Sequence, residues 1–522
     1  MKTFHYGEDY LISSQALAIA KGELKGELSP STIVAIHKSA AYVKTIVDKG
    51  DVVYGINTGF GPLCTTLIDA DDTRKLQENI LKSHAVGVGE PIAEELSKLM
   101  LILKVHALAK GFSGVQFSTV ERILWHIDQD VIPVVPKQGS VGASGDLAPL
   151  SHLFLPLIGL GKVHYKNEIR HTADVLAEFN LEPIELGAKE GLALINGTQF
   201  MAAHAVKAVV EMSRVLDTAD LVATLMIEGL NGSIKPFYKE LHQLRPYKGS
   251  SYVASKIYNL LAGSAILESH KNCSRVQDPY SLRCIPQVHG ASRNAWLHLK
   301  EIIETEINAV TDNPIIINDE LTISGGSFHG QPIALPMDYA TLAMSEIGNI
   351  SDRRVYLSLE GVTNGVPKLL MKVTGLNSGF MILQYTTAAL ASENKGLCFP
   401  SSADSIPTSL GQEDHVSMGS ISGRKLLQVI ENVDKILSIE LLCAAQAKDF
   451  HAPLVSTPII EKLHQHIRTR IPHLEEDQPM QDILDNALEF VKKGDILRIA
   501  NDVAAQQGVS YKEAFAENFE NF

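Results

Sequence analysis

The chain has 522 residues, of which 45% are hydrophobic and 20% are charged, a composition typical of soluble globular proteins and not of disordered ones. A single hydrophobic core stops growing well below this length, so we expect two or three lobes. The net charge is −14 and the Lys and Arg residues form no basic stripe, which excludes nucleic acid as an expected partner.

The cysteines and the apolar segments bear on the compartment of the protein. Five cysteines are scattered along the chain and none forms a CxxC pair, which favours a reducing compartment and argues against a zinc site. The N-terminus lacks the apolar region of a signal peptide, and the most apolar stretch, residues 147–161, is too short to cross a bilayer. We therefore expect a cytoplasmic protein with no membrane partner and no metal in its site.

Residues 1–200 are expected to form a mixed, loop-rich N-terminal lobe. A helical pattern over residues 94–110 alternates there with stretches rich in Gly and Pro, notably 54–62 and 132–149. Gly and Pro interrupt regular structure, and loops of this kind often carry binding and catalytic residues. These two stretches are therefore the first candidates for a functional site.

Residues 201–522 are expected to form a bundle of long helices followed by a C-terminal helical region. Ala, Val, Leu and Met recur there at three- and four-residue spacing with hardly any helix breaker. Long helical segments are predicted at residues 199–230, 291–310, 338–359, 424–450 and 481–504. Several exceed the average helix length, so the sequence predicts a mainly α fold built on a long central helical bundle.

One loop segment, Gly139 to Pro149, reads Gly-Ser-Val-Gly-Ala-Ser-Gly-Asp-Leu-Ala-Pro. It lacks the Gly-Lys-Ser/Thr end of a phosphate-binding loop, and its spacing differs from the Gly-x-Ser-x-Gly turn of serine hydrolases. A different chemistry uses the backbone itself: the amide nitrogen of Gly145, which no side chain hinders, attacks the carbonyl carbon of Ala143, and water is lost. Loss of the Ser144 hydroxyl then leaves an exocyclic methylidene group.

The same segment resembles the signature of the aromatic amino acid ammonia-lyases, and the resemblance extends from about Tyr54 to Gly419. Members of that family form 4-methylideneimidazol-5-one (MIO) from an internal Ala-Ser-Gly. The resemblance implies that Ala143, Ser144 and Gly145 form this electrophile, with no external cofactor. It also implies the ammonia-lyase/fumarase-like architecture and a homotetramer with shared active sites. The implied activity is that of a carbon-nitrogen lyase, which removes ammonia from an aromatic amino acid.

Further motifs of the family match this sequence residue by residue. Tyr54 matches the tyrosine proposed to remove the β-proton, and Asn196 matches the asparagine that hydrogen-bonds the MIO ring. Arg283 matches the residue that binds the substrate carboxylate, a task suited to its forked donors. The roles implied are catalytic for Tyr54, Ala143, Ser144, Gly145, Tyr280 and Glu413, and substrate-binding for His84, Asn196, Gln277, Arg283 and Phe328.

Two positions bear on the identity of the substrate. The pair Ser83-His84 resembles histidine-specific members of the family, and His84 is able to hydrogen-bond a polar ring. Glu413, within Gln412-Glu-Asp-His415, also matches the histidine-specific form, in which a carboxylate accepts a hydrogen bond from imidazole. We therefore expect L-histidine as the substrate and trans-urocanate as the product, the first step of histidine degradation.

Other hypotheses stay open at this point. Tyrosine is the nearest rival substrate, because a phenol also hydrogen-bonds to His84. An MIO aminomutase would return the ammonia to the β-carbon, and a non-enzymatic scaffold would keep the fold without the mature ring. The chain departs from the commonest histidine-specific pattern at Ser327 and Gly411, both beside expected site residues.

Overall fold

The computed structural model describes residues 3–49, 53, 55–56, 58, 70–271, 276–512 and 519. The chain forms two compact units, and several segments contribute to each. Unit 1 comprises Met1–Val209, Leu299–Asp338 and Pro400–Arg424, and unit 2 comprises Val210–His298, Tyr339–Phe399 and Lys425–Phe522. The domain boundary predicted after residue 200 stays a prediction.

The first helices of unit 1 build its hydrophobic core. They are α1 (Ser13–Ala20), α2 (Pro30–Lys49), α3 (Ala70–His84), α4 (Glu94–Ala109), α5 (Phe117–Asp128), α6 (Leu147–Phe154), α7 (Thr172–Glu178) and α8 (Glu190–Ile195). Every side chain of α4 from Leu96 to Ala109 is buried, because α1, α2, α5 and α6 pack around it. The helix predicted over residues 94–110 is thus confirmed. Helices α3, α6 and α8 also pack on one another, and their ends meet at the loop that precedes α6.

The strands of unit 1 form small separate sheets that hold the loops between helices in place. Strand β1 (Thr3–His5) pairs in parallel with β2 (Lys25–Glu27). The other pairings are antiparallel: β3 (Val88–Pro91) with β5 (Pro136–Gln138), β4 (Ile132–Pro133) with β6 (Lys162–Tyr165), β6 with β7 (Glu168–His171), and β8 (Ile315–Ile316) with β9 (Thr322–Ile323). The β3–β5 pair matters most for the site. It places the chain that follows α3 beside the chain that enters the loop before α6.

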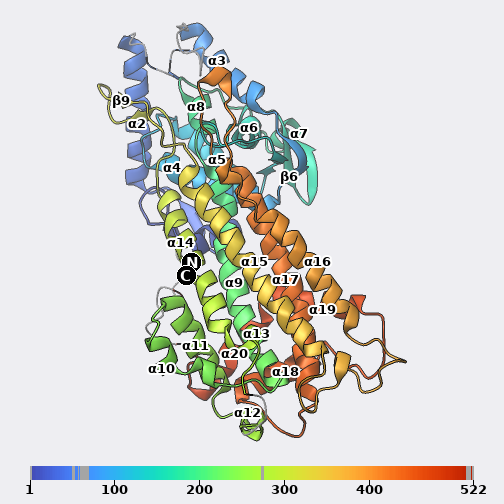
Figure 1. Ribbon diagram of the computed structural model, residues 1–522. Helices are drawn as coiled ribbons and strands as arrows, with labels where there is room; N and C mark the ends of the chain where they lie inside the picture. The colour runs from blue at the N-terminus through green and yellow to red at the C-terminus, as the bar shows by residue number, and fades with distance from the viewer. Residues whose placement is uncertain are drawn as a thin grey trace. The chain divides into compact units, whose positions relative to one another are not determined.

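Long helices contribute residues to both units and are coloured from green to orange in Figure 1. They are α9 (Gln199–Gly229), α14 (Ile285–Glu306), α15 (Gln331–Leu359) and α17 (Gly419–Asp449). The long helices predicted at 199–230, 291–310, 338–359 and 424–450 are therefore confirmed. Helix α15 begins earlier than predicted because Pro336 is accommodated inside it, where a proline usually breaks or kinks a helix.

The single helix predicted over residues 481–504 is wrong. The structure has two helices there, α19 (Gln481–Lys492) and α20 (Asp495–Gln507), separated at Gly494, which has a φ of 70°. Left-handed backbone interrupts a helix, and glycine adopts it without steric cost. The remaining helices of unit 2 are α10 (Lys239–Gln243), α11 (Lys248–Leu261), α12 (Ala265–Ser269), α13 (Tyr280–Arg283), α16 (Met381–Leu397) and α18 (Pro458–Arg468).

In unit 2 buried ion pairs join the long helices, in addition to apolar packing. Arg214 of α9 contacts Asp434 of α17 at 2.7 Å, and Arg354 of α15 contacts Glu440 of α17 at 2.5 Å. The predicted mainly α fold with long packed helices is thereby confirmed. Over the described ranges, the structure contains no helix with the length and apolar character needed to cross a membrane.

Candidate active site

The loop between β5 and α6 holds the triplet Ala143-Ser144-Gly145 in a tightly curled backbone. Gly139, Gly142 and Gly145 have φ angles of 132°, 81° and 81°, and Ser144 has a φ of 51°. Such angles are natural for glycine, but a non-glycine residue adopts them at a cost of about 1–3 kcal/mol. The contacts around the loop must therefore hold Ser144 in place.

On one side the loop lies against the backbone that follows α8. The amide of Asp146 donates to the carbonyl of Gly197 at 2.8 Å, and the amide of Gly197 donates to the carbonyl of Ser144 at 3.3 Å. A Cβ atom on Gly145 would lie 2.0 Å from the Gly197 carbonyl oxygen. This space admits no side chain, so the close approach requires glycine at position 145.

On the other side the loop lies against the residues that lead into α17. The amide of Met418 donates to the carbonyl of Val141 at 3.0 Å. A Cβ atom on Gly142 would lie 2.2 Å from the hydroxyl oxygen of Ser417. The triplet is thus compressed between two segments that lie far from it in the sequence.

Asp146 is fully buried next to the triplet. Its carboxyl oxygens accept hydrogen bonds from the hydroxyl of Ser140 at 2.9 Å and from the amide of Met201 in the first turn of α9 at 3.0 Å. Burial raises the pKa of this carboxyl to about 7, although both hydrogen bonds act in the opposite direction. A group that changes protonation near neutral pH therefore adjoins Gly145.

These contacts fit the formation of an MIO ring from the triplet. Ring closure requires the nitrogen of Gly145 to approach the carbonyl carbon of Ala143, and the left-handed backbone at Ser144 curls the chain that way. Ala143 is buried against Val416 and Met418, so the segment has little room to straighten. The residues present in the loop are therefore suited to this group.

Asn196 is buried directly after the last residue of α8. Its side-chain amide donates to the carbonyl of Leu192 at 3.1 Å, and its own carbonyl accepts a hydrogen bond from Lys104 Nζ of α4 at 2.5 Å. Burial lowers the pKa of Lys104 to about 7, although the carboxylate of Asp312 favours the charged form. Through its hydrogen bond to the carbonyl of Asn196, Lys104 holds the end of α8 next to the segment against which Gly145 packs.

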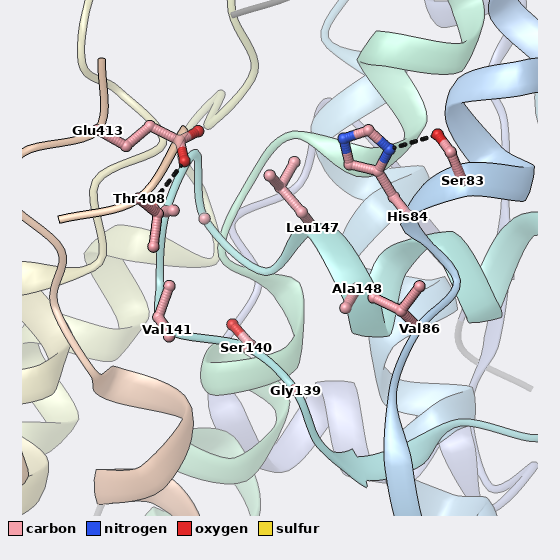
Figure 2. Close-up of a pocket in the computed structure, with 12 residues that line it drawn as sticks. Ser83, His84, Val86, Gly139, Ser140, Val141, Leu147, Ala148, Thr408 and Glu413 are labelled. Carbon is pink, nitrogen blue, oxygen red and sulfur yellow. Dashed lines mark hydrogen bonds between the residues drawn. The ribbon is translucent and has the colours of Figure 1, made fainter. Parts of the chain in front are cut away.

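A pocket of about 290 Å³ lies beside the triplet (Figure 2). The end of α3 contributes His84, the loop contributes Ala143 and Gly145, and the turn before α17 contributes Glu413. Its volume is close to the lower end of the range of about 300–1,000 Å³ that is common for small-molecule sites. The structure therefore brings His84, Glu413 and the triplet together at one pocket in unit 1.

His84 and Glu413 lie on opposite sides of this pocket (Figure 2). The Nδ1 atom of His84 is 2.9 Å from the hydroxyl oxygen of Ser83. Burial lowers the pKa of His84, although the backbone of Ile80 and the charge of Glu413 act in the opposite direction, so the neutral imidazole is favoured. Glu413 Oε1 accepts a hydrogen bond from Ser144 Oγ at 3.2 Å, which directs the carboxylate toward the triplet.

The other predicted site residues lie in three places. Phe328 is half-buried in the loop of unit 1 that precedes α15, and Tyr54 lies outside the described residues. Gln277, Tyr280 and Arg283 belong to unit 2, where the guanidinium of Arg283 lies 4.5 Å from the ring centroid of Tyr280. The roles assigned to all of these residues stay predictions.

Sequence reasoning missed several polar side chains that organise the site. Lys104 was detectable in principle, because it is an isolated charge within the apolar run of residues 99–105. Asp146 belongs to the matched loop segment, but its residue type alone indicates no role. Thr408 and Ser409, whose hydroxyls both donate to Glu413, carry no signal that distinguishes them from surface hydroxyls.

Comparison with known proteins agrees with this geometry. Residues 11–469 match the model of the aromatic amino acid lyase family. The histidine ammonia-lyase of Natranaerobius thermophilus is 43% identical over 490 residues, which cover 94% of this chain and 96% of that protein. The crystal structure of histidine ammonia-lyase from Trypanosoma cruzi has a TM-score of 0.90 and 38% identity, with 99% of this chain and 97% of that one covered.

A second solved structure is similar in fold but differs in the activity that its name gives. Tyrosine aminomutase from Streptomyces globisporus has a TM-score of 0.91 and 32% identity, with 96% of this chain and 99% of that chain covered. The expected ammonia-lyase architecture is thereby confirmed. From the match over residues 11–469 and from these likenesses, we conclude that the chain belongs to the aromatic amino acid lyase family.

Proposed function

We propose that this carbon-nitrogen lyase removes ammonia from L-histidine without oxidation and releases trans-urocanate, the first step of histidine degradation. The observation that carries the proposal is the hydrogen bond from Ser144 Oγ to Glu413 Oε1 at 3.2 Å. It brings the residue expected to bear the electrophile next to a carboxylate that is able to bond an imidazole. The relatives named histidine ammonia-lyase support the same substrate.

The polar groups of the pocket suit an imidazole ring. A neutral imidazole has one donor and one acceptor nitrogen. Glu413 accepts a hydrogen bond from the donor nitrogen of the substrate ring. His84, on the opposite side of the pocket, donates a hydrogen bond to the acceptor nitrogen. A phenyl ring would offer no hydrogen bond to Glu413 Oε1 or to the second ring nitrogen of His84, which disfavours phenylalanine.

The remaining roles follow from the family motifs and from the chemistry of each side chain. Arg283 binds the substrate carboxylate through paired donors, and Asn196 orients the reactive end of the site. Tyr54 takes the β-proton, a step to which a positioned base typically contributes about 10²- to 10⁴-fold. Tyr280 acts as a second catalytic polar group. Gln277 and Phe328 contact the substrate.

Ala143, Ser144 and Gly145 provide the electrophile as an MIO ring, formed with the loss of two waters. When formed, the ring supplies an electrophilic carbon that ordinary side chains lack and so makes ammonia easier to expel. The protein holds the backbone of this segment through the carbonyl of Gly197. Asp146 follows Gly145 directly in the chain, and a carboxyl group with a pKa of about 7 can hold or accept a proton in this loop.

The proposed partner is a small amino acid, and the proposed compartment is the cytoplasm. Cys284 and Cys443 are free thiols in the structure, and a reducing compartment keeps thiols in this form. We propose no role for nucleic acid or for a membrane, in line with the acidic net charge of −14.

We also propose that the protein acts as a homotetramer whose subunits share active sites. Large apolar side chains of unit 2 are about half exposed on α15, at Tyr339, Leu342 and Tyr356, and on α16, at Ile382 and Tyr385. Exposed apolar surface of this kind marks contacts with other protein surfaces. A second copy of the chain is the partner that the family resemblance implies.

Sedimentation and mixed variants test the shared site. Sedimentation equilibrium is expected to give the mass of four chains. Ser144→Ala and Arg283→Met subunits, each inactive alone, are expected to regain part of the activity when co-expressed, because some sites then combine intact residues from both. A fully active monomer would contradict the shared site.

The reaction itself is tested with purified protein and three substrates, L-histidine, L-tyrosine and L-phenylalanine. We expect urocanate absorbance and one equivalent of ammonia from histidine, and turnover of the other two at least about 100-fold slower, which corresponds to about 2.7 kcal/mol of discrimination. Glu413→Gln serves as the matched variant, since it keeps the shape of the side chain and removes the charge. Turnover of tyrosine without turnover of histidine would overturn the proposal.

The similarity to a tyrosine aminomutase makes a second reaction worth measuring. An aminomutase would return ammonia to the β-carbon, so β-histidine or β-tyrosine would accumulate. Chromatography of the same reaction mixtures separates the α- and β-amino acids. We expect no β-amino acid, and its appearance as the main product would favour the second reaction.

A further inference from the structure

We propose that Thr408 and Ser409 are positioning residues for the substrate, because their hydroxyls hold one oxygen of Glu413 and so direct the other oxygen toward Ser144 and the pocket. We call this pair the hydroxyl clamp. The inference rests on the proposed function, in which Glu413 binds the imidazole. It adds the groups that determine where that carboxylate points.

The two oxygens of Glu413 have separate partners. Oε2 accepts hydrogen bonds from Thr408 Oγ1 and from Ser409 Oγ, each at 2.8 Å. Oε1 accepts the hydrogen bond from Ser144 Oγ at 3.2 Å. Figure 2 shows Thr408 bonded to the carboxylate at the edge of the pocket. One oxygen is therefore held by the turn, and the other faces the reactive triplet.

The turn between Thr408 and Glu413 is built to bring these groups together. The amide of Thr408 donates to the carbonyl of Glu413 at 2.9 Å, and the amide of Glu413 donates to the carbonyl of Thr408 at 3.4 Å. Between them Ser409, Leu410 and Gly411 have φ angles of 49°, 56° and 87°. The side chain of Leu410 is 95% exposed, so burial of that side chain does not offset its strained backbone. Strain of this kind is typical of functional sites.

The clamp makes Glu413 ready for a ligand before the ligand arrives. A free glutamate side chain has several rotatable bonds, and ordering them when a substrate binds weakens binding. The clamp orders this side chain within the folded chain instead. Because loss of the Ser144 hydroxyl accompanies ring formation, Oε1 then becomes available to the N–H group of an imidazole. The clamp therefore acts on substrate binding and not on maturation of the loop.

Matched pairs of variants test the clamp in the full-length protein. Thr408→Val keeps the shape of the side chain and removes the hydroxyl, whereas Thr408→Ser keeps the hydroxyl. Ser409→Ala and Ser409→Thr form the corresponding pair. We expect Thr408→Val to lower kcat/KM for L-histidine by about ten- to a hundredfold, the usual value of a hydrogen bond to a charged group, chiefly through a higher KM. Ser409→Ala should cost less, because Ser409 is exposed and water can replace its hydroxyl.

Two further measurements separate the clamp from structural damage. All four variants should keep the two-water mass deficit of the matured loop and the wild-type urea midpoint, and the two variants that keep a hydroxyl should retain near-wild-type KM. If Thr408→Val matches wild type, or if Thr408→Ser is as impaired as Thr408→Val, the clamp is refuted. If instead wild type itself does not convert histidine, the proposed function fails, and the clamp fails with it.

Discussion

Two fully buried carboxyl groups, Asp146 in unit 1 and Asp220 in unit 2, have pKa values shifted in opposite directions. Asp146 accepts hydrogen bonds from neutral donors, and burial raises its pKa to about 7. Burial acts in the same sense on Asp220, but Arg293 at 2.5 Å and Lys256 at 3.2 Å hold its pKa well below the usual range. His289 also contacts Asp220, at 2.8 Å.

Because both carboxyl groups are buried, the difference between their pKa values comes from their partners, and this difference determines whether each group can titrate near neutral pH. Asp220 stays ionised and joins α9 to α14, which carries His289 and Arg293, so its role is to hold helices together. Asp146, whose pKa is about 7, can gain or lose a proton near neutral pH beside the triplet that we propose forms the MIO ring. The reactive loop combines a titratable group with backbone contacts that tolerate no side chain, whereas the charge cluster of unit 2 combines ions of opposite sign.

The largest expected effect comes from a methyl group added to the reactive loop. In Gly145→Ala the new Cβ would lie 2.0 Å from the Gly197 carbonyl oxygen, and the backbone has a φ of 81°. We expect loss of the two-water mass deficit and activity below about 1% of wild type, a change of at least about 2.7 kcal/mol in the barrier. Gly365→Ala is the matched control, because Gly365 has a φ of 83° but nothing within 4 Å of the new Cβ. Equal damage in both variants would show that φ alone matters.

The next effect concerns stability in unit 2. Asp220→Asn leaves Arg293 and Lys256, both buried, with less counter-charge, and breaking a buried pair costs about 3–5 kcal/mol. Since the pKa of Asp220 is lower in the folded state, its stabilisation is present above pH 4 and is lost as the pH falls below that value. Urea unfolding followed by the fluorescence of Trp296 in a Trp125→Phe background reports on unit 2, because the chain has two tryptophans. An unchanged midpoint at pH 7 would show that the cluster does not stabilise the unit.

A smaller, pH-dependent effect is expected at Asp146. Its pKa is raised in the folded state, so the folded chain binds more protons between pH 4 and 7, and stability falls as the pH rises through this window. The largest loss that a shift from 3.8 to about 7 permits is about 4 kcal/mol.

The measurement compares urea midpoints of Ser144→Ala and Ser144→Ala/Asp146→Asn proteins at pH 5 and pH 8, so that the triplet cannot mature in either. The protein with Asp146 should lose stability relative to the Asn variant as the pH rises. A relative gain with rising pH would mean that Asp146 is paired like Asp220.

The smallest effect is expected at the hydrogen bond between the neutral hydroxyl of Ser83 and the neutral ring of His84. Ser83→Ala removes the contact of 2.9 Å with Nδ1 of His84. A neutral hydrogen bond contributes about 0.5–1.5 kcal/mol, so kcat/KM for histidine should fall by about two- to tenfold. Ser83→Thr keeps the hydroxyl and serves as the control. If Ser83→Ala lowers kcat/KM more than Thr408→Val does, the His84 side of the pocket contributes more to substrate binding than the Glu413 side, which would contradict this prediction.

The sequence predicts the long helices well because their apolar spacing is local information. It fails at Gly494, where a single left-handed residue separates α19 from α20, and at Pro336, which lies inside α15. Whether glycine breaks a helix, or a helix tolerates proline, depends on tertiary packing that a pattern of residues does not contain.

The candidate site shows the same limit. The motif around Ser144 predicted the reactive loop, and the motif around Glu413 predicted a second part of the site. That the two are in contact is a property of the fold, since they are 269 residues apart. The burial of Asp146 and the bond from Lys104 to Asn196 likewise depend on distant packing, so neither role was predicted.

The most direct test of the account compares wild-type and Ser144→Ala proteins by intact mass and by conversion of L-histidine. We predict that the wild-type chain is lighter than its sequence by two waters and forms urocanate, and that Ser144→Ala shows neither the two-water deficit nor turnover. A wild-type chain with the full sequence mass that still converts histidine would contradict the account, as would a Ser144→Ala protein with wild-type activity.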